Sequence, residues 1–310
     1  MSFDRCQALI ISLENARKLP TPPGVALRVV ELCRDEDVPL DEIATIFESD
    51  PALASRLLKY VNSPLLGPGR SIRTVRQAIS YAGLKAARSI ALGFTLSRAD
   101  YPIECPRFSL SRFWKESFAT AVVARQVSVL QHAADRDTAF ITGLLSGIGR
   151  LLLAIGVPQA YAQVFERLDL GERLLDAERE IIGVDHAQFG GALLRNWGLP
   201  DEITQAVAHQ FAPESAEPKH HTLARTVREG RALTPVFVRE RPLAGETRAR
   251  IRNLVETELG LDESSWPPVA KSILEGLSEV GDIFDVRIED TKAWLDIYAQ
   301  VQDEEEREAA

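Results

Sequence analysis

The sequence predicts an all-α protein, and two observations lead to that prediction. Apolar residues recur at helical spacing through most of the 310-residue chain, whereas no convincing run alternates apolar and polar residues as a half-buried strand does. Only the stretch LTPVFVRERP (233–242) is a candidate for a short strand. The composition, 45% hydrophobic and 26% charged, is that of an ordinary globular protein.

Individual helices begin with recognisable signals. Asp50 is placed to cap a helix whose first residue is Pro51, where the missing N–H of proline costs nothing. The residues predicted to form the buried stripe of this helix are Leu53, Leu57, Leu58 and Val61. Farther along, AFITGLLSGIGRLLLA (139–154) predicts one buried helix, in which Ser146 and Gly147 interrupt an otherwise apolar centre.

Proline-rich stretches divide the chain. RADYPIECPRFS (98–109) and FAPESAEPKHH (211–221) have the composition of connections between lobes. We therefore expect an N-terminal helix and two helical lobes, followed by a C-terminal extension with two amphipathic helices. The predicted ranges are 1–18 for the N-terminal helix, 19–100 and 108–215 for the lobes, and 222–302 for the extension.

The net charge of −9 argues against general nucleic-acid binding, but the charge is unevenly distributed. Residues 51–99 contain eight Lys and Arg residues and no Asp or Glu. This stretch either pairs with acidic helices elsewhere or presents a surface to an anion or an acidic partner, for which the fork of arginine is suited. The residues predicted to form that surface are Arg70, Arg73, Arg76, Lys85 and Arg88.

The location of the protein is predicted from what the sequence does not contain. No signal peptide is recognisable, and no window approaches the roughly 18 apolar residues of a membrane span. Cys6, Cys33 and Cys105 are scattered and form no CxxC pair. We interpret them as core thiols of a protein in the reducing cytoplasm, without structural zinc.

Five histidines are the first candidates for metal chemistry. His132, His220 and His221 lie in polar stretches and are expected at the surface. His186 follows a potential capping Asp185, and His209 ends a helix that begins near Pro200. The tight turn between these two helices could bring both imidazoles toward one core, although two structural histidines are the simpler interpretation.

A series of short sequence motifs, spaced along most of the chain, resembles the pattern of one protein family. In the N-terminal part they are Leu19-Pro20, Pro23, Asp50-Pro51, Leu57-Leu58, Asn62-Ser63, Ile72, Ala78-Ile79 and Gly83. They continue in FWKESFATAVVARQV, TGLLSGIGRLLLA and VDHAQFGGALLRNWGLPDEITQAVAHQF. This series, over roughly residues 14–215, resembles the HDOD domain of the HD superfamily of metal-dependent phosphohydrolases. The resemblance implies an HDOD domain at 19–215, a helical bundle with an N-terminal lobe and a degenerate HD lobe.

The resemblance also explains the interruption at residues 146 and 147. Catalytic HD enzymes carry an adjacent His and Asp there, and both hold the metal; this chain has Ser146 and Gly147. The first ligand His would fall near Glu116, and the closing Asp would fall where this chain offers Arg225 or Arg228. At least three of the four expected ligands are therefore absent, and we expect no bound metal.

His186 and His209 match positions that help the HD-GYP relatives bind further metal ions. Without the first pair of ligands, these histidines cannot assemble that centre. Serine and glycine at 146 and 147 can be buried at little cost, whereas an unpaired Asp at that depth would cost several kcal/mol or take up a proton. The positions Glu116, Ser146, Gly147, His186 and His209 are thus predicted to be a vestige of the HD site.

The resulting functional prediction is a bacterial signalling or regulatory module without enzymatic activity or cofactor. HDOD proteins resemble regulators that accompany response-regulator receiver domains or cyclic-dinucleotide enzymes, so non-covalent signalling proteins from such pathways are the expected partners. Membrane association is not expected, and binding of nucleic acid is disfavoured. Two alternatives are a sensor that binds a nucleotide or cyclic dinucleotide in the vestigial phosphate pocket and a residual metal-dependent phosphohydrolase.

Overall fold

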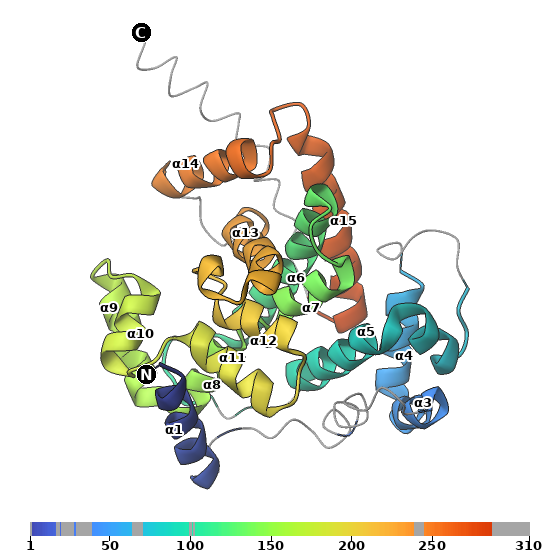
Figure 1. The fold of residues 1–310 in the computed structure, drawn as a ribbon, viewed down its shortest axis with the longest axis horizontal. Helices are drawn as coiled ribbons and strands as arrows, with labels where there is room; N and C mark the ends of the chain where they lie inside the picture. Colours follow the sequence, from blue (N-terminus) through green and yellow to red (C-terminus); the bar gives the residue numbers. More distant parts are fainter. Residues whose placement is uncertain are drawn as a thin grey trace.

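The computed structural model describes residues 2–16, 19, 28, 39–63, 71–98, 101, 103–238 and 245–286. Every regular element within these ranges is helical, which confirms the all-α prediction. Helices from both ends of the sequence pack on a central group made of α6, α7, α8, α11, α12 and α13 (Figure 1). The bounds of that group are Leu110–Gln131, Arg136–Leu145, Ile148–Gly156, His186–Asn196, Asp201–Ala208 and His221–Phe237.

The N-terminal lobe consists of three described helices that pack on one another (Figure 1). They are α3 (Leu40–Glu48), α4 (Pro51–Val61) and α5 (Val75–Arg98). The predicted start of α4 is confirmed, because the carboxylate of Asp50 accepts hydrogen bonds from the amides of Ala52 and Leu53. Helix α5 is kinked at Gly83, whose φ of 81° is in the left-handed region that favours glycine.

The stretch 139–154 is two helices, not the single helix that its apolar composition predicts. Helix α7 ends at Leu145 and α8 begins at Ile148, so the chain bends at Ser146 and Gly147. The prediction that no stretch of the chain is long and apolar enough to span a membrane was wrong for one segment. By length and composition, Arg136–Gly156 is apolar enough to cross a membrane, but 89% of its most apolar window is buried inside the structure, as expected for core helices.

The strand predicted at 233–242 is wrong over its described part. Residues 233–237 form the end of α13, and residues 239–242 lie outside the described residues. Leu233, Val236 and Phe237 are buried on α13, which packs against α6, α7 and α12. Tertiary packing therefore overrides the strand preference of this β-branched and aromatic stretch. Helix α13 then ends two residues after Pro235, which cannot donate a helical hydrogen bond.

Helix α1 (Ser2–Asn15) packs against α11. The side-chain amide of Gln7 donates to Asn196 over 3.2 Å. Leu13 lies against Gly156 at the end of α8, so closely that a Cβ on that glycine would be 2.7 Å from a Leu13 methyl. The N-terminal helix therefore contacts two helices of the central group.

The C-terminal extension contains α14 (Gly245–Asn253), a π-helical turn η4 (Leu254–Glu258) and α15 (Trp266–Phe284). Helix α15 runs beside α6 (Figure 1). Phe284 and Phe118 join these two helices, with ring centroids 4.4 Å apart. The extension is thus attached to the same core as the central group.

Two small helices complete the central lobe beside α8 and α11. They are α9 (Pro158–Asp169) and α10 (Leu174–Ile181). Neighbouring helices approach closely at Gly190 and Gly191. A Cβ on Gly190 would lie 3.1 Å from the backbone of Gly149, and one on Gly191 would lie 2.7 Å from the carbonyl oxygen of Thr204.

The predictions for surface histidines and core cysteines have mixed outcomes. Cys6 and Cys105 are buried and free, as predicted, and Cys33 lies outside the described residues. His132 is exposed and His221 is half-buried, but His220 is only 7% exposed. The surface prediction for His220 is wrong because the 3-10 turn η3 (Pro218–His220) packs against α12 and α13.

Candidate functional site

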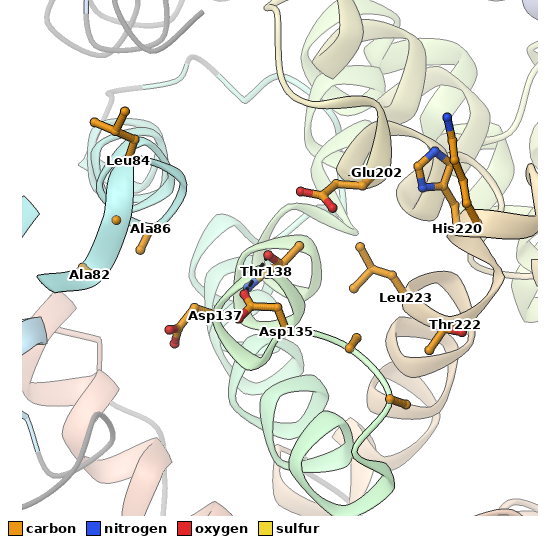
Figure 2. A pocket seen from close by; sticks show the side chains of 14 residues that line it. Ala82, Leu84, Ala86, Asp135, Asp137, Thr138, Glu202, His220, Thr222 and Leu223 are labelled. Atoms are coloured by element: carbon orange, nitrogen blue, oxygen red, sulfur yellow. Dashed lines mark hydrogen bonds between the residues drawn. The ribbon is translucent and has the colours of Figure 1, made fainter. Parts of the chain in front are cut away.

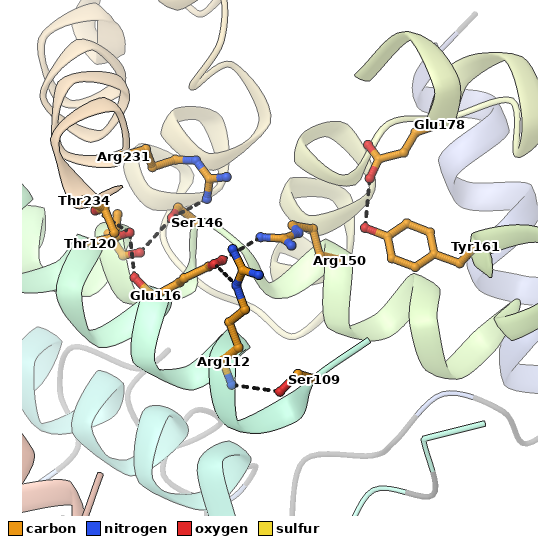
Figure 3. A network of polar contacts seen from close by, with 11 residues as sticks. Ser109, Arg112, Glu116, Thr120, Ser146, Arg150, Tyr161, Glu178, Arg231 and Thr234 are labelled. Carbon is orange, nitrogen blue, oxygen red and sulfur yellow. Dashed lines mark hydrogen bonds and ion pairs between the residues drawn. The ribbon is translucent and has the colours of Figure 1, made fainter. Parts of the chain in front are cut away.

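Ser146 lies at the bend between α7 and α8, where its polar atoms are all satisfied by protein partners. Its hydroxyl donates to the Gly143 carbonyl over 2.7 Å and accepts from Nη1 of Arg231 over 3.2 Å (Figure 3). Its own carbonyl accepts from the Gln210 side chain over 2.8 Å. The side chain is 1% exposed, so it belongs to a closed network.

Gly147 faces the same group of side chains. A Cβ built on it would lie 3.3 Å from the Phe113 ring and 3.7 Å from Nη1 of Arg231. A metal-binding side chain at residue 147 would therefore extend between the ring of Phe113 and the guanidinium of Arg231.

Glu116, on α6, is held by arginines from two helices. Arg112 donates to one carboxylate oxygen over 2.8 Å, and Arg150 of α8 donates to the other over 3.0 Å (Figure 3). Burial opposes ionisation of this carboxyl, but the two arginines outweigh it and hold the pKa of Glu116 below its ordinary value. Glu116 thus neutralises cations, with both of its oxygens engaged.

Arg231, on α13, adds a further, half-buried cation. Burial and the neighbouring Arg150 lower the pKa of Arg231 to about 10, so the side chain stays charged at neutral pH. Its guanidinium lies 5.4 Å from the ring centroid of Phe211, a cation–π contact. Among the described residues it forms no ion pair with a carboxylate. The cluster therefore carries more positive than negative charge.

His186 is fully buried at the start of α11 and faces a carboxylate. Its Nδ1 lies 2.7 Å from Glu178, which also accepts from the His186 amide and from the Tyr161 hydroxyl. Burial lowers the pKa of His186, whereas these contacts outweigh burial and lower the pKa of Glu178. The pair is therefore a neutral imidazole that donates through Nδ1 to an ionised carboxylate.

The remaining nitrogen of His186 has no partner in the described part of the chain. Nε2 is buried and makes no hydrogen bond there, as is also the case for Nε of Arg150 and Oε1 of Gln210. The ring packs edge-on against Phe211, at 5.4 Å between centroids. Arg231 and Arg150 both lower the pKa of this imidazole, so positive charge already acts on its free nitrogen.

His209 occupies the C-terminal end of α12 and is half-buried. Burial lowers the pKa of His209, while Asp185 raises it and Arg195 lowers it further. The charged groups that act on His209 therefore differ from the arginines that act on His186. The sequence correctly predicted that Asp185 caps α11: its carboxylate accepts from the amide of Gln188 over 2.9 Å.

These residues do not fit the metal centre of the HD superfamily. Within the described ranges, no three His, Cys, Asp or Glu side chains are grouped to hold a metal ion. Arginine has no lone pair to offer a metal, and Arg150 and Arg231 would repel a divalent cation. The carboxylate of Glu116 is already engaged by two guanidinium groups, and that of Glu178 is engaged by His186 and Tyr161.

Sequence reasoning missed three residues of this cluster. Arg231, rather than Arg225 or Arg228, is the residue of α13 that reaches Ser146. Arg150 and Glu178 were not singled out: Arg150 is a charged residue inside an apolar helical pattern, whereas Glu178 lies among other charged residues. A charged residue on the buried face of an amphipathic helix indicates that it is paired with another group, but it does not identify that partner.

The predicted basic surface is described only in part. Arg73 and Arg76 are exposed, and Arg76 forms an exposed ion pair with Asp41 at 3.1 Å. Arg70 and the side chains of Lys85 and Arg88 lie outside the described residues. An exposed pair of this kind contributes little to stability, so its arginine remains available to an acidic partner.

The fold and the site together define an all-helical domain in which Glu116, Arg150, Arg231 and Ser146 form a network of polar contacts. Residues 19–213 match the HDOD domain, and the chain belongs to the HDOD family. An uncharacterised protein of Treponema pallidum (strain Nichols) is 24% identical over 216 residues, which cover 66% of this chain. The chain spans 41% of the length of that relative.

Solved structures with the same fold come from several bacteria. A "putative phosphohydrolase" from Shewanella amazonensis SB2B has a TM-score of 0.68 at 22% identity, and the match covers 89% of this chain and 98% of that one. An HDOD domain protein with unknown function from Geobacter sulfurreducens has a TM-score of 0.63 at 20% identity, over 97% and 94% of the two chains. At these identities the similarity shows the fold alone.

Proposed function

We propose that this chain is a non-catalytic signalling module that acts through non-covalent protein partners in the cytoplasm. The observation that carries the proposal is the arrangement of Glu116, Arg150 and Arg231 around Ser146. These contacts are internal ion pairs and hydrogen bonds that engage Glu116 and Ser146, which would otherwise be the side chains facing a metal ion. A related fold, covering 92% of this chain, belongs to a "putative signal transduction protein" from Marinobacter aquaeolei VT8. Components of response-regulator or cyclic-dinucleotide pathways are the partners that we expect.

The metal content of the protein tests the loss of catalysis first. Elemental mass spectrometry on protein purified without a metal-affinity tag should find no near-stoichiometric iron, manganese or zinc. Near-stoichiometric metal, together with hydrolysis of a chromogenic phosphodiester that a chelator abolishes, would support the residual phosphohydrolase instead. Glu116 and His186 would then be the ligands to replace.

Partner capture tests the surface at Arg73 and Arg76. Reversing both charges with Arg73→Glu and Arg76→Glu should reduce the yield of co-purified partners from cross-linked cells, without a change in circular dichroism. Arg173→Glu is the matched control, because this side chain is 85% exposed and lies on the other lobe. Equal capture by both variants would show that residues 73 and 76 are not the partner surface.

The positive charge of the buried cluster favours one alternative, a phosphate-bearing ligand held without hydrolysis. Arg231 forms no ion pair with a carboxylate in the described part of the chain, and the buried Nε of Arg150 lacks a hydrogen-bond partner there. Arginine forks suit phosphate oxygens. A thermal-shift screen of nucleotides and cyclic dinucleotides tests this sensor function, since a ligand at 100 times its Kd stabilises a protein by about 2.7 kcal/mol. A flat screen, or a shift that Arg231→Met leaves unchanged, would count against it.

A further inference from the structure

Glu229 is a buried carboxyl group on α13 that takes no part in the cluster around Ser146. Its side chain is 1% exposed, and its Oε2 accepts a hydrogen bond from the side-chain amide of Gln131, on α6, over 2.8 Å. Nη2 of Arg228, the preceding residue, lies 3.9 Å from its other oxygen, Oε1, which is too far for a hydrogen bond. The carboxyl group therefore has a neutral donor in contact and a cation just out of contact.

The same arginine joins α13 to the C-terminal extension. Nη2 of Arg228 lies 2.5 Å from Oε2 of Glu258, the last residue of the turn η4, and both of these side chains are 38% exposed. One nitrogen of Arg228 thus lies between two carboxyl groups. One of them is buried on its own helix, and the other is half-exposed on the extension.

The turn η4 is itself an unusual element. It is π-helical, a geometry that is rare and frequently lies at functional sites. It continues directly from the end of α14, and its residues Leu254 and Val255 are buried while Glu258 reaches Arg228. The ion pair of Glu258 therefore connects α13 to the end of an irregular helical turn.

The charged groups that act on Glu229 come from α13 and η4. Burial and the carboxylate of Glu258 oppose the ionisation of Glu229, whereas Gln131, Arg228 and Arg225 favour it. Burial is the largest of these effects, and the pKa of Glu229 is raised to about 7. This carboxyl group therefore changes its charge near neutral pH.

The other elements that pack on α13 present their titratable side chains elsewhere. Those of α7, α12, η3 and the turn before α7 line a separate pocket beside α5, of which Glu229 is not part (Figure 2). They are Asp135, Asp137, Glu202, Lys219 and His220. On α6, Nε of Arg125 lies 3.9 Å from Asp137, and on η2 Glu214 is exposed. The groups that govern Glu229 are therefore those around Arg228.

We propose that Glu229, Arg228 and Glu258 form a pH-sensitive switch, which loosens η4 and α14 from α13 when Glu229 releases its proton to solvent. An ionised Glu229 attracts Arg228 across the gap of 3.9 Å and repels Glu258, so the ion pair with the extension weakens. Linkage requires the same result. Because a docked Glu258 opposes the ionisation of Glu229, the ionisation of Glu229 opposes the docking of Glu258 by an equal free energy.

The contact between α13 and η4 is therefore tighter below pH 7 than above it. An ordinary carboxyl group stays ionised throughout the neutral range and could not act in this way. Helix α15 packs on α6 and α4 and takes no part in the ion pair, so the loosening is expected to be confined to α14 and η4. The switch does not depend on the partners or the metal content proposed above, and those tests can fail without affecting it.

Hydrogen–deuterium exchange of the full-length chain, followed by mass spectrometry from pH 6 to pH 8, tests the switch. Observed rates are compared with the intrinsic rates at each pH, so that the readout is a protection factor. Protection of α14 and η4 should fall about three- to tenfold over this range, with a midpoint near pH 7. A low concentration of urea should leave the fall unchanged, because a local opening exposes little surface.

Three variants identify the groups. Glu229→Gln keeps an acceptor for Gln131 without a charge, and its protection in α14 and η4 should be high and independent of pH. Glu258→Gln loses the ion pair but keeps the titration of Glu229, and its protection there should be low and independent of pH. Glu263→Gln is the matched control, because Glu263 is an exposed residue of the extension, and it should behave as the natural protein does.

These variants also separate the local switch from the general effect of Glu229 on stability. The proposal is overturned if protection of α14 and η4 in the natural protein does not change with pH, or if Glu229→Gln retains the change. It is equally overturned if the change occurs only through a urea-sensitive opening that α15 shares, because ionisation would then loosen the whole core.

Discussion

Nη1 of Arg231 lies 3.2 Å from the hydroxyl of Ser146, so a cation from α13 reaches the bend between α7 and α8. Arg150 reaches the neighbouring Glu116 from the other side of that bend, at 3.0 Å. The carboxylate of Glu116 therefore lies among the guanidinium groups of Arg112, Arg150 and Arg231 in a partly buried place. The contribution of these contacts to the free energy of unfolding can be measured.

Removing Glu116 should destabilise the protein more than removing its partner does. Glu116→Leu leaves Arg112, Arg150 and Arg231 close together without their carboxylate, and we expect a loss of about 2 kcal/mol in the free energy of unfolding. Arg150→Leu costs less, because Arg112 still pairs with Glu116. Urea denaturation of both single variants and of the double variant measures the coupling. Strictly additive losses would show that the pair contributes nothing as a pair.

Alanine should affect the stability of the protein very differently at Gly149, inside α8, and at Gly147, at the start of that helix. A Cβ on Gly149 would lie 1.9 Å from the carbonyl oxygen of His186, so Gly149→Ala should lose about 3 kcal/mol or more, or fail to fold. Gly147→Ala places its Cβ 3.3 Å from the Phe113 ring, and its φ of −94° is accessible to alanine. We expect its stability to stay within about 1 kcal/mol of the natural protein. Thermal denaturation of the two variants makes the comparison, and equal losses would contradict it.

Stability should fall as the pH rises toward neutrality because of Glu229. Burial raises the pKa of this carboxyl to about 7, and its Oε2 accepts from Gln131 over 2.8 Å. The folded state therefore keeps a proton that the unfolded state loses near pH 4.5, so stability from this group is full below pH 4.5 and is lost as the pH rises to about 7.

Glu229→Gln removes that titration and keeps an acceptor for Gln131. The variant should gain thermal stability relative to the natural protein at pH 8, and the difference should shrink at pH 5. The control is Glu263→Gln, whose exposed side chain should give no such pH-dependent difference. A Glu229→Gln difference that stays constant from pH 5 to pH 8 would rule out the raised pKa.

Two helix caps of the same type should differ in cost because they differ in surroundings. Asp185 caps α11 and pairs with Arg179 at 2.8 Å, and its side chain is 1% exposed. Asp50 caps α4 and is only half-buried. Asp50→Ala should cost about 1 kcal/mol, the usual value for a cap, and Asp185→Ala should cost about 2–3 kcal/mol because the Gln188 amide and the Arg179 guanidinium both lose their acceptor. Chemical denaturation checks the order, and the reverse order would contradict this account.

Local chemistry made much of the fold predictable from the sequence. The caps at Asp50 and Asp185 each depend on residues near in sequence, and each is confirmed. Ser146 could also be singled out, because a polar residue in an apolar helix needs a local reason, but its role in a functional site stays a prediction.

The partners across helices could not be predicted in the same way. Which arginine of α13 meets Ser146 depends on how that helix is rotated and shifted against α7, and Arg225, Arg228 and Arg231 occur at spacings that the sequence alone does not distinguish. His220 was misplaced for a similar reason, since its burial comes from packing of the 3-10 turn η3. The false strand at 233–237 shows tertiary contacts prevailing over local preference.

Helix α1 packs on the outside of the central lobe. It is fastened to α11 through Gln7 and Asn196 and to α8 through Leu13 at Gly156, and these are the two helices that carry His186 and Arg150. Its outer face exposes Ile11, which is 55% accessible. Helix α1 therefore connects an exposed apolar side chain at the surface with the two helices that carry His186 and Arg150.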